Sequence, residues 1–199
     1  MEGRTERLAA SAVPVGQLKY QINGAAHRLE FVRFLSLFRK SFADRFNDSV
    51  VWTGGQIVGN VAQLPGIAAL RRGGILHRME QFEIGDLRGD FNNQTIVIEY
   101  EQKQLPLSNL VKYWPYVHGE LNVKPNRPIL LCHFSDWWSY GTYRDLWNWV
   151  MLRMQTDGER IVNIHGHQFD HGGSDASLRD AGVRAALDWI SVLSANAPT

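Results

Sequence analysis

Hydrophobic residues recur at the spacing of an α-helix in four stretches of the chain. In the first, residues 27–47, a phenylalanine occurs every three or four positions beside a flank of arginine and lysine. The others are residues 106–117, which begin with a proline suited to a first helical turn, 143–154 and 178–193. We therefore expect four helices, the first of them with one basic face.

Shorter apolar or alternating stretches between these helices predict strands. Residues 79–104 have the pattern of a β-hairpin that turns at Asn92-Asn93, because asparagine tolerates the positive φ that such turns need. Residues 129–134 are almost wholly apolar, as in a strand at the centre of a sheet, and residues 161–164 predict one more strand.

Glycine and proline are frequent in the remaining segments. Residues 1–27 are expected to be irregular or a short strand, and residues 50–74 to form loops with a short helix around 67–72. The order of elements is helix, hairpin, helix, strand, helix, strand, helix. This order predicts an α/β fold in one domain of residues 1–199, with a mixed central β-sheet flanked by helices.

The second strand of the hairpin carries charge on one face. Side chains alternate along a strand, so Glu99, Glu101 and Lys103 share one side with Val97. A solvated face with a Glu–Lys pair would give the same pattern and contribute only about a few tenths of a kcal/mol. Because the sequence that follows is strongly apolar, the carboxylates instead favour a site for a metal, another cation or a proton.

The two-residue turn also sets the partners across the hairpin. It places these residues opposite one another: Asp86 and Glu99, Ile84 and Glu101, Phe82 and Lys103, Asp90 and Thr95. Opposed Cβ atoms lie roughly 4.5–5.5 Å apart and point the same way. Asp86, Glu99 and Glu101 are therefore expected to converge within reach of one divalent ion, with Lys103 beside it. A register shifted by one residue would move Asp86 to the other face.

Composition narrows the function classes without choosing one. With 44% hydrophobic residues among 199, the chain can bury a substantial core, and its net charge of +1 provides no overall basic field for nucleic acid. The single cysteine, Cys132, lies in an apolar stretch and is expected to be a buried thiol, which excludes a disulfide within the chain. Neither a signal-peptide pattern nor a membrane-spanning apolar run occurs, so a cytoplasmic protein with no membrane partner is expected.

The order of charged residues and elements resembles that of the PD-(D/E)xK nuclease superfamily. An acid in the first hairpin strand precedes two charged residues at alternate positions of the second, then a helix and an apolar strand follow. The resemblance covers about residues 28–156, with residues 160–195 as a C-terminal strand and helix. It implies a restriction-endonuclease-like fold that hydrolyses DNA with Mg²⁺, or Mn²⁺ in its place. Asp86, Glu99 and Glu101 would hold the metal and Lys103 would assist hydrolysis.

The chain also departs from the pattern of this superfamily. Gly85 stands where a proline often precedes the first acid. The second strand is readable as Glu99-x-Glu101, with glutamate in the lysine position, or as Glu101-x-Lys103. In the first reading the amine comes from Lys103 or from Lys112 on the next helix.

Three further features have competing interpretations. Asn109-x-x-x-Tyr113 is similar to the Q-x-x-x-Y of RecB-type nucleases but lies close to the strand. Trp137-Trp138, in a loop after an apolar strand, are candidates for contact with a ligand. The basic residues of the first helix either form a phosphate-binding rim or are a solvated face: Arg28, Arg33, Arg39, Lys40 and Arg45.

A histidine cluster near the C-terminus is a rival site. His165, His167, Asp170 and His171 are zinc ligands by type, and their order looks like the H-x-H-x-D-H motif of metallo-β-lactamases with one residue too many. The alternative is a polar, glycine-rich loop before a helix, with a turn at His171-Gly172-Gly173.

The sequence thus favours a Mg²⁺-dependent deoxyribonuclease. One alternative is an inactive relative that serves as an interaction or nucleic-acid-binding module, and another is a zinc-dependent hydrolase that uses His165, His167 and His171. Restriction-type enzymes often act as dimers because cleavage of a duplex needs two sites, so the resemblance also leaves a homodimer open.

Overall fold

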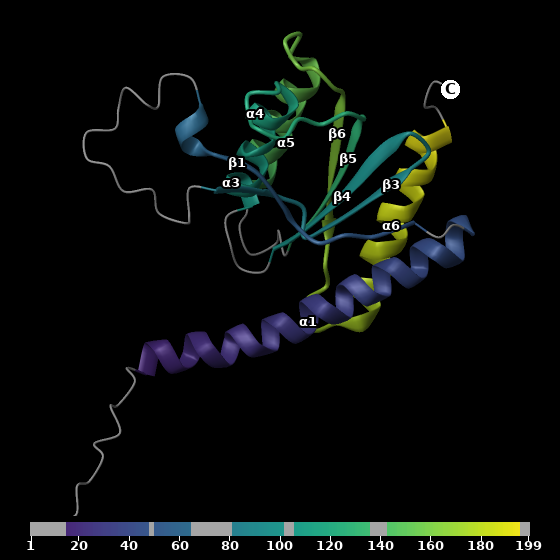
Figure 1. Ribbon diagram of the computed structural model, residues 1–199. Coiled ribbons are helices and arrows are strands. Elements are labelled where there is room, and N and C mark those ends of the chain that lie inside the picture. Colours follow the sequence, from purple (N-terminus) through teal and green to yellow (C-terminus); the bar gives the residue numbers. More distant parts are fainter. Residues whose placement is uncertain (1–14, 48–49, 65–80, 102–105, 136–142, 196–199) are drawn as a thin grey trace, which may run out of the picture.

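A mixed four-stranded sheet forms the centre of the protein. The structure is a computed structural model that describes residues 15–47, 50–64, 81–101, 106–135 and 143–195. The strand order is β3 (Leu87–Phe91), β4 (Gln94–Glu101), β5 (Ile129–Ser135), β6 (Ile164–Asp170). β3 runs antiparallel to β4, whereas β5 and β6 run parallel to β4, as Figure 1 shows. The apolar strand expected at the centre of the sheet is β5, and it lies beside the acidic strand β4.

Helices cover both faces of this sheet (Figure 1). One face packs against α1 (Val15–Phe46) and α6 (Ala176–Ala195). The other face packs against α3 (Pro106–Val111), α4 (Tyr113–Val117) and α5 (Tyr143–Thr156). Each face has its own cluster of buried apolar side chains. The predicted mixed sheet flanked by helices is therefore confirmed.

Alternation along β4 sends Ile98 and Tyr100 to one face, and Val97 with the acidic residues to the other. Ile98 and Tyr100 lie in the cluster under α1, where the Tyr100 ring centroid is 4.7 Å from that of Phe34. Val97 belongs to the opposite cluster, and Glu99 lies on that same side. The carboxylates of β4 consequently project into the layer between the sheet and α3–α4.

The hairpin has the predicted turn and register. Asn92 and Asn93 have φ values of 47° and 60°, the positive values that a two-residue hairpin turn requires. Phe91 pairs with Gln94 and Leu87 with Ile98, which brings the residue before Leu87 opposite Glu99. The local turn chemistry alone therefore places Asp86 beside Glu99.

The first strand of the hairpin ends sooner than expected. Gly85 has φ +69°, and it separates β3 from β2 (Gln81–Ile84), which pairs with β1 (Gln56–Asn60) in a sheet of its own. Ile84 therefore lies opposite Gln56, and Phe82 opposite Gly59. The predicted pairing of Ile84 with Glu101 is wrong, because the left-handed turn at Gly85 leads the chain away from β4. Lys103, the predicted partner of Phe82, lies outside the described residues.

Three element boundaries also differ from expectation. α1 begins at Val15 rather than at residue 27, since extending a helix costs less than nucleating one. The helix expected over 106–117 is divided into α3 and α4, because Pro115 has no N–H to bond the carbonyl of Val111. The strand expected at 161–164 instead runs over 164–170, where a glycine-rich loop had been the alternative to a zinc site. The turn at Gly172-Gly173 is present, with φ values of 71° and 53°.

The remaining segment between the helix and the hairpin is only partly described. It contains β1 and a 3-10 helix, Val61–Gln63, while the helix expected around residues 67–72 lies outside the described residues. No helix in the described part of the chain is long and apolar enough to cross a lipid bilayer.

Candidate active site

A small cavity on the α3–α4 side of the sheet is lined by one amine and three carboxylates, one of which belongs to the exposed residue Glu83. The cavity has a volume of about 210 Å³. Its lining residues come from β2, the start of β3, β4 and α3–α4: Gln81, Glu83, Gly85, Asp86, Glu99, Asn109 and Lys112. Asp86 and Glu99 thus line the same space, as the hairpin register predicted.

Glu99 is a buried carboxylate with several donors. Its side chain is only 3% exposed, and its Oε1 accepts the N–H of Gly85 at 2.9 Å and the hydroxyl of Tyr113. The Lys112 Nζ lies 2.8 Å from the same oxygen. A carboxylate removed from water needs such partners, since burying an unpaired charge costs several kcal/mol. These contacts fix the position of Glu99 at the cavity wall.

The amine in this site is that of Lys112. It belongs to the short link between α3 and α4, which places it over the β3–β4 hairpin. Lys103, the other candidate, lies outside the described residues. Lys112 is one of the two lysines suggested by the sequence, and the structure brings its ammonium to the Glu99 carboxylate.

Asp86 has an unusual protonation equilibrium. Burial, the largest cause, and the neighbouring negative charge of Glu99 together raise its pKa from 3.8 to about 7. The backbone N–H of Tyr100, which donates to Asp86 Oδ2 at 2.8 Å, and the ammonium of Lys112 act in the opposite direction. A carboxyl group of this kind takes up or releases a proton near neutral pH, and a bound cation would favour its charged form.

Glu101 lies next to the cavity but does not line it. It is 4% exposed, Asn109 Nδ2 donates to its Oε1, and its negative charge contributes to the raised pKa of Asp86. Its Oε2 has no hydrogen-bond partner among the described residues and lies 3.8 Å from the Nε2 of His133. The three acids therefore influence one another, while only Asp86 and Glu99 face the same space.

A buried histidine and tryptophan stand behind Glu101. The indole N–H of Trp147, on α5, donates to His133 Nδ1 at 2.8 Å. Because Nδ1 accepts this bond, a neutral His133 ring carries its proton on Nε2, the atom nearest Glu101. His133 is also the β5 partner of Glu99 in the parallel register. Sequence reasoning treated this histidine as part of an apolar strand, and only the register across β4 and β5 relates it to the site.

The Asn109-x-x-x-Tyr113 spacing does relate to the site. Asn109 donates to Glu101, and Tyr113 donates to Glu99, so the two residues contact different acids of β4. Burial and the charge of Glu99 raise the pKa of Tyr113 well above its usual value, which keeps its hydroxyl proton in place as a donor. The similarity of Asn109-x-x-x-Tyr113 to the RecB-type Q-x-x-x-Y was therefore a sequence signal for these two site residues. It carried little weight in the sequence because the two residues follow the strand so closely.

The histidine cluster is arranged differently from a zinc site. His165 and His167 lie on β6, and the His167 ring stacks on Trp189 of α6 with centroids 5.9 Å apart. His171 is buried and packs against the Tyr100 ring at 4.7 Å. Burial lowers the pKa of His165 and His167. Within the described residues, no group of three or more His, Cys, Asp or Glu side chains is placed to hold a metal, at this cluster or at Asp86.

The other candidates from the sequence have local structural roles or are not described. Arg45 pairs with Asp188 of α6 at 2.8 Å, so one basic residue of α1 joins two helices. Cys132 is fully buried, as expected, and burial raises the pKa of its thiol. Trp137 and Trp138 lie outside the described residues.

Comparison with known proteins gives this chain no relative. Protein-family models, curated proteins and solved structures all yield no match. Conclusions about function consequently depend on the geometry described above.

Proposed function

We propose that this protein is a Mg²⁺-dependent nuclease of the PD-(D/E)xK type that hydrolyses phosphodiester bonds in DNA. The observation that carries the proposal is the meeting of Asp86, Glu99 and Lys112 at one cavity. A helix, the β3–β4 hairpin, two short helices and a parallel strand follow in the order that the sequence resemblance implies. The restriction-endonuclease-like fold is part of the proposal.

The donor set suits a hard divalent cation. Mg²⁺ prefers carboxylate oxygens together with water, and Asp86 and Glu99 offer carboxylates beside a cavity with room for water. The raised pKa of Asp86 reflects burial and repulsion by Glu99, both of which a nearby cation would offset. Asp86 and Glu99 would hold the ion, with Glu101 adjoining them. When bound, Mg²⁺ polarises a phosphoryl oxygen and lowers the pKa of a water molecule.

The surrounding residues contribute position and charge. Tyr113 and Gly85 hold the Glu99 carboxylate in place before any substrate arrives, which reduces the reorganisation needed during reaction. The Lys112 ammonium lies at the cavity wall, where it would meet the negative charge of a phosphate. Lys112 thus takes the role that the sequence assigned to Lys103 or Lys112.

One observation favours a second candidate, an inactive relative that binds partners or nucleic acid. Glu99 Oε1 already accepts three donors, and the described residues include no ready-made triad of metal ligands. In an inactive relative, Lys112 would serve as a permanent counter-ion for Glu99. The two candidates differ in metal binding and in cleavage.

Nicking of supercoiled plasmid DNA in Mg²⁺ or EDTA separates them. We expect the wild-type protein to nick plasmid only with the metal, and Asp86→Asn, Glu99→Gln and Lys112→Met each to lose at least about a hundredfold in rate. Asp180→Asn is the control, because Asp180 is exposed on α6, which covers the other face of the sheet. Intact plasmid with the wild-type protein, together with no thermal shift on adding Mg²⁺ or Mn²⁺, would favour the inactive relative.

A further inference from the structure

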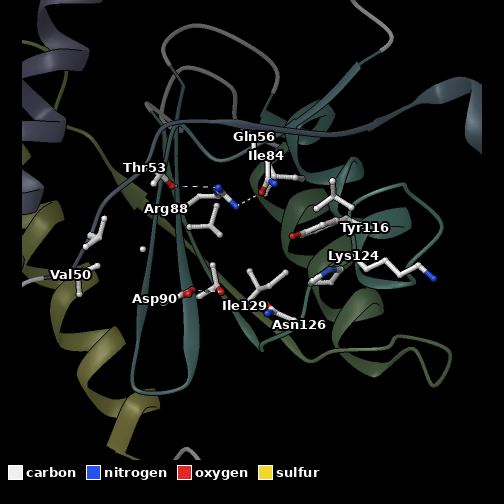
Figure 2. A pocket seen from close by; sticks show the side chains of 16 residues that line it. Val50, Thr53, Gln56, Ile84, Arg88, Asp90, Tyr116, Lys124, Asn126 and Ile129 are labelled. Atoms are coloured by element: carbon white, nitrogen blue, oxygen red, sulfur yellow. Dashed lines mark hydrogen bonds between the residues drawn. The ribbon is translucent and has the colours of Figure 1, made fainter.

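A second and larger cavity lies beside the candidate active site. It has a volume of about 740 Å³, within the range of small-molecule sites, which is roughly 300–1,000 Å³. Figure 2 shows Arg88 between Thr53 and Gln56, with Tyr116 and Lys124 on the helical side. Its floor contains the buried side chains of Val97 and Ile129.

This cavity lies on the same face of the hairpin as the candidate active site. Arg88 is two residues after Asp86 on β3, and it lies opposite Val97, which is two residues before Glu99 on β4. Residues two apart on a strand point to the same side, and they are separated by about 7 Å. The Arg88–Val97 pair is therefore the next step along the sheet from the Asp86–Glu99 pair.

Arg88 is held in place without a carboxylate partner. Its guanidinium donates to Gln56 Oε1, as well as to Thr53 Oγ1 at 3.4 Å (Figure 2). Its backbone also exchanges two hydrogen bonds of 2.8 Å with Thr53. Asp90, which also lines the cavity, accepts a hydrogen bond from Thr95 and pairs with Arg127 at 3.2 Å. Among the described residues, no acid forms an ion pair with Arg88, and its buried Nε has no hydrogen-bond partner.

These features suit one unit of a nucleic acid strand. A fixed guanidinium with an unused N–H recognises phosphate oxygens, and the exposed Lys124 adds positive charge at the rim. Tyr116, a residue that is 7% exposed, and the apolar floor line the part of the cavity where a sugar or base would lie. Electrostatic attraction to phosphate and contact with a ring are the two components of single-strand binding.

We propose that the Arg88 cavity binds the nucleotide next to the scissile phosphate, with Arg88 contacting its phosphate group. This inference depends on the proposed nuclease function, which supplies the scissile phosphate at Asp86 and Glu99. Arg88 is then a binding residue. The distance along the hairpin from the Asp86–Glu99 pair to the Arg88–Val97 pair sets the separation between the scissile phosphate and the neighbouring nucleotide.

Binding of a short fluorescent DNA in EDTA tests the inference without cleavage. We expect Arg88→Met to weaken DNA binding at least about tenfold. The slope of log affinity against log salt concentration should also fall by the amount expected for about one phosphate contact. Arg184→Met is the control, because Arg184 is exposed on α6, which covers the other face of the sheet. Arg88→Lys should recover part of the affinity, since it keeps the charge but not the fork of donors. Equal binding by Arg88→Met and Arg184→Met would overturn the inference.

Two further measurements keep the test decisive. If Arg88→Met does not fold, the exposed Lys124→Met variant takes its place: loss of affinity supports the inference, and unchanged affinity overturns it. A deoxynucleoside monophosphate should compete for the site better than inorganic phosphate, and equal competition would overturn the assignment to a nucleotide. A lack of cleavage by the wild-type protein in Mg²⁺ would refute the nuclease proposal, whereas the Arg88 result would still report on DNA binding.

Discussion

Replacing Asp86 with asparagine should stabilise the metal-free protein, and the gain should depend on pH. An asparagine carbonyl can still accept the N–H of Tyr100, which donates to Asp86 Oδ2 at 2.8 Å. It removes a carboxyl whose pKa is raised from 3.8 to about 7, first by burial and then by Glu99. The substitution therefore removes an unfavourable charge while keeping the local hydrogen bond.

The sign follows from proton binding in the two states. Between pH 4 and pH 7 the unfolded chain has released the Asp86 proton, while the folded protein still holds it, because the folded pKa is about 7. The folded state then binds more protons than the unfolded state. The contribution of Asp86 to the free energy of unfolding of the wild type therefore falls as pH rises through this interval and is constant above it. Below pH 4 both states are protonated, and the effect disappears.

The magnitude comes from the same two pKa values. A difference of about three pKa units corresponds to about 4 kcal/mol at alkaline pH, and about 2–3 kcal/mol of this develops between pH 5 and pH 8. The free energy of unfolding of Asp86→Asn should thus exceed that of the wild type by about 2–3 kcal/mol more at pH 8 than at pH 5.

Urea unfolding in EDTA at pH 5, 6, 7 and 8 measures this difference. Asp90→Asn is the control, because its carboxyl is exposed and pairs with Arg127 at the surface. The difference in the free energy of unfolding between Asp90→Asn and the wild type should not grow in this way between pH 5 and pH 8. A constant difference between Asp86→Asn and wild type from pH 5 to pH 8 would refute the reasoning, since it would show that Asp86 titrates normally.

Three further substitutions test the packing around the site by urea or thermal unfolding. Gly85→Ala should cost about 2 kcal/mol, because φ is +69° and the new Cβ would lie 2.8 Å from two side-chain carbons; Gly158→Ala, with nothing within 4 Å, should change little. Tyr113→Phe should cost about 1.5–3 kcal/mol through the lost donor to Glu99, and an unchanged unfolding midpoint would contradict that role. Trp147→Phe should cost about 2 kcal/mol by removing the bond to the buried histidine, and it fails as a prediction if the melting temperature is unaltered.

Local sequence features were enough to predict the part of the site that lies on the hairpin. The Asn92-Asn93 turn fixes the pairing of the two strands, and alternation then puts Asp86 and Glu99 on one face. The helical spacing of phenylalanines and the apolar run of β5 were equally local, so α1 and the central strand were also predicted. Each of these features depends on residues close together in the chain.

The features that were missed depend on residues far apart in sequence or on a single backbone angle. The positive φ of Gly85 diverts β2 away from β4, and a hydrophobic pattern carries no signal for it. The approach of Trp147 to His133 is set by how α5 packs on the sheet. Lys112 was only one of two candidate amines, because its place over Glu99 depends on where α3 ends.

Anomalous diffraction from crystals soaked with Mn²⁺ would locate a metal bound by Asp86 and Glu99. We expect a manganese peak in the cavity between these two carboxylates, with metal–oxygen distances of about 2.0–2.2 Å. Crystals of Asp86→Asn treated in the same way should show no peak there. A wild-type crystal with no metal in this cavity, or with manganese bound instead by His165 and His167, would contradict the account.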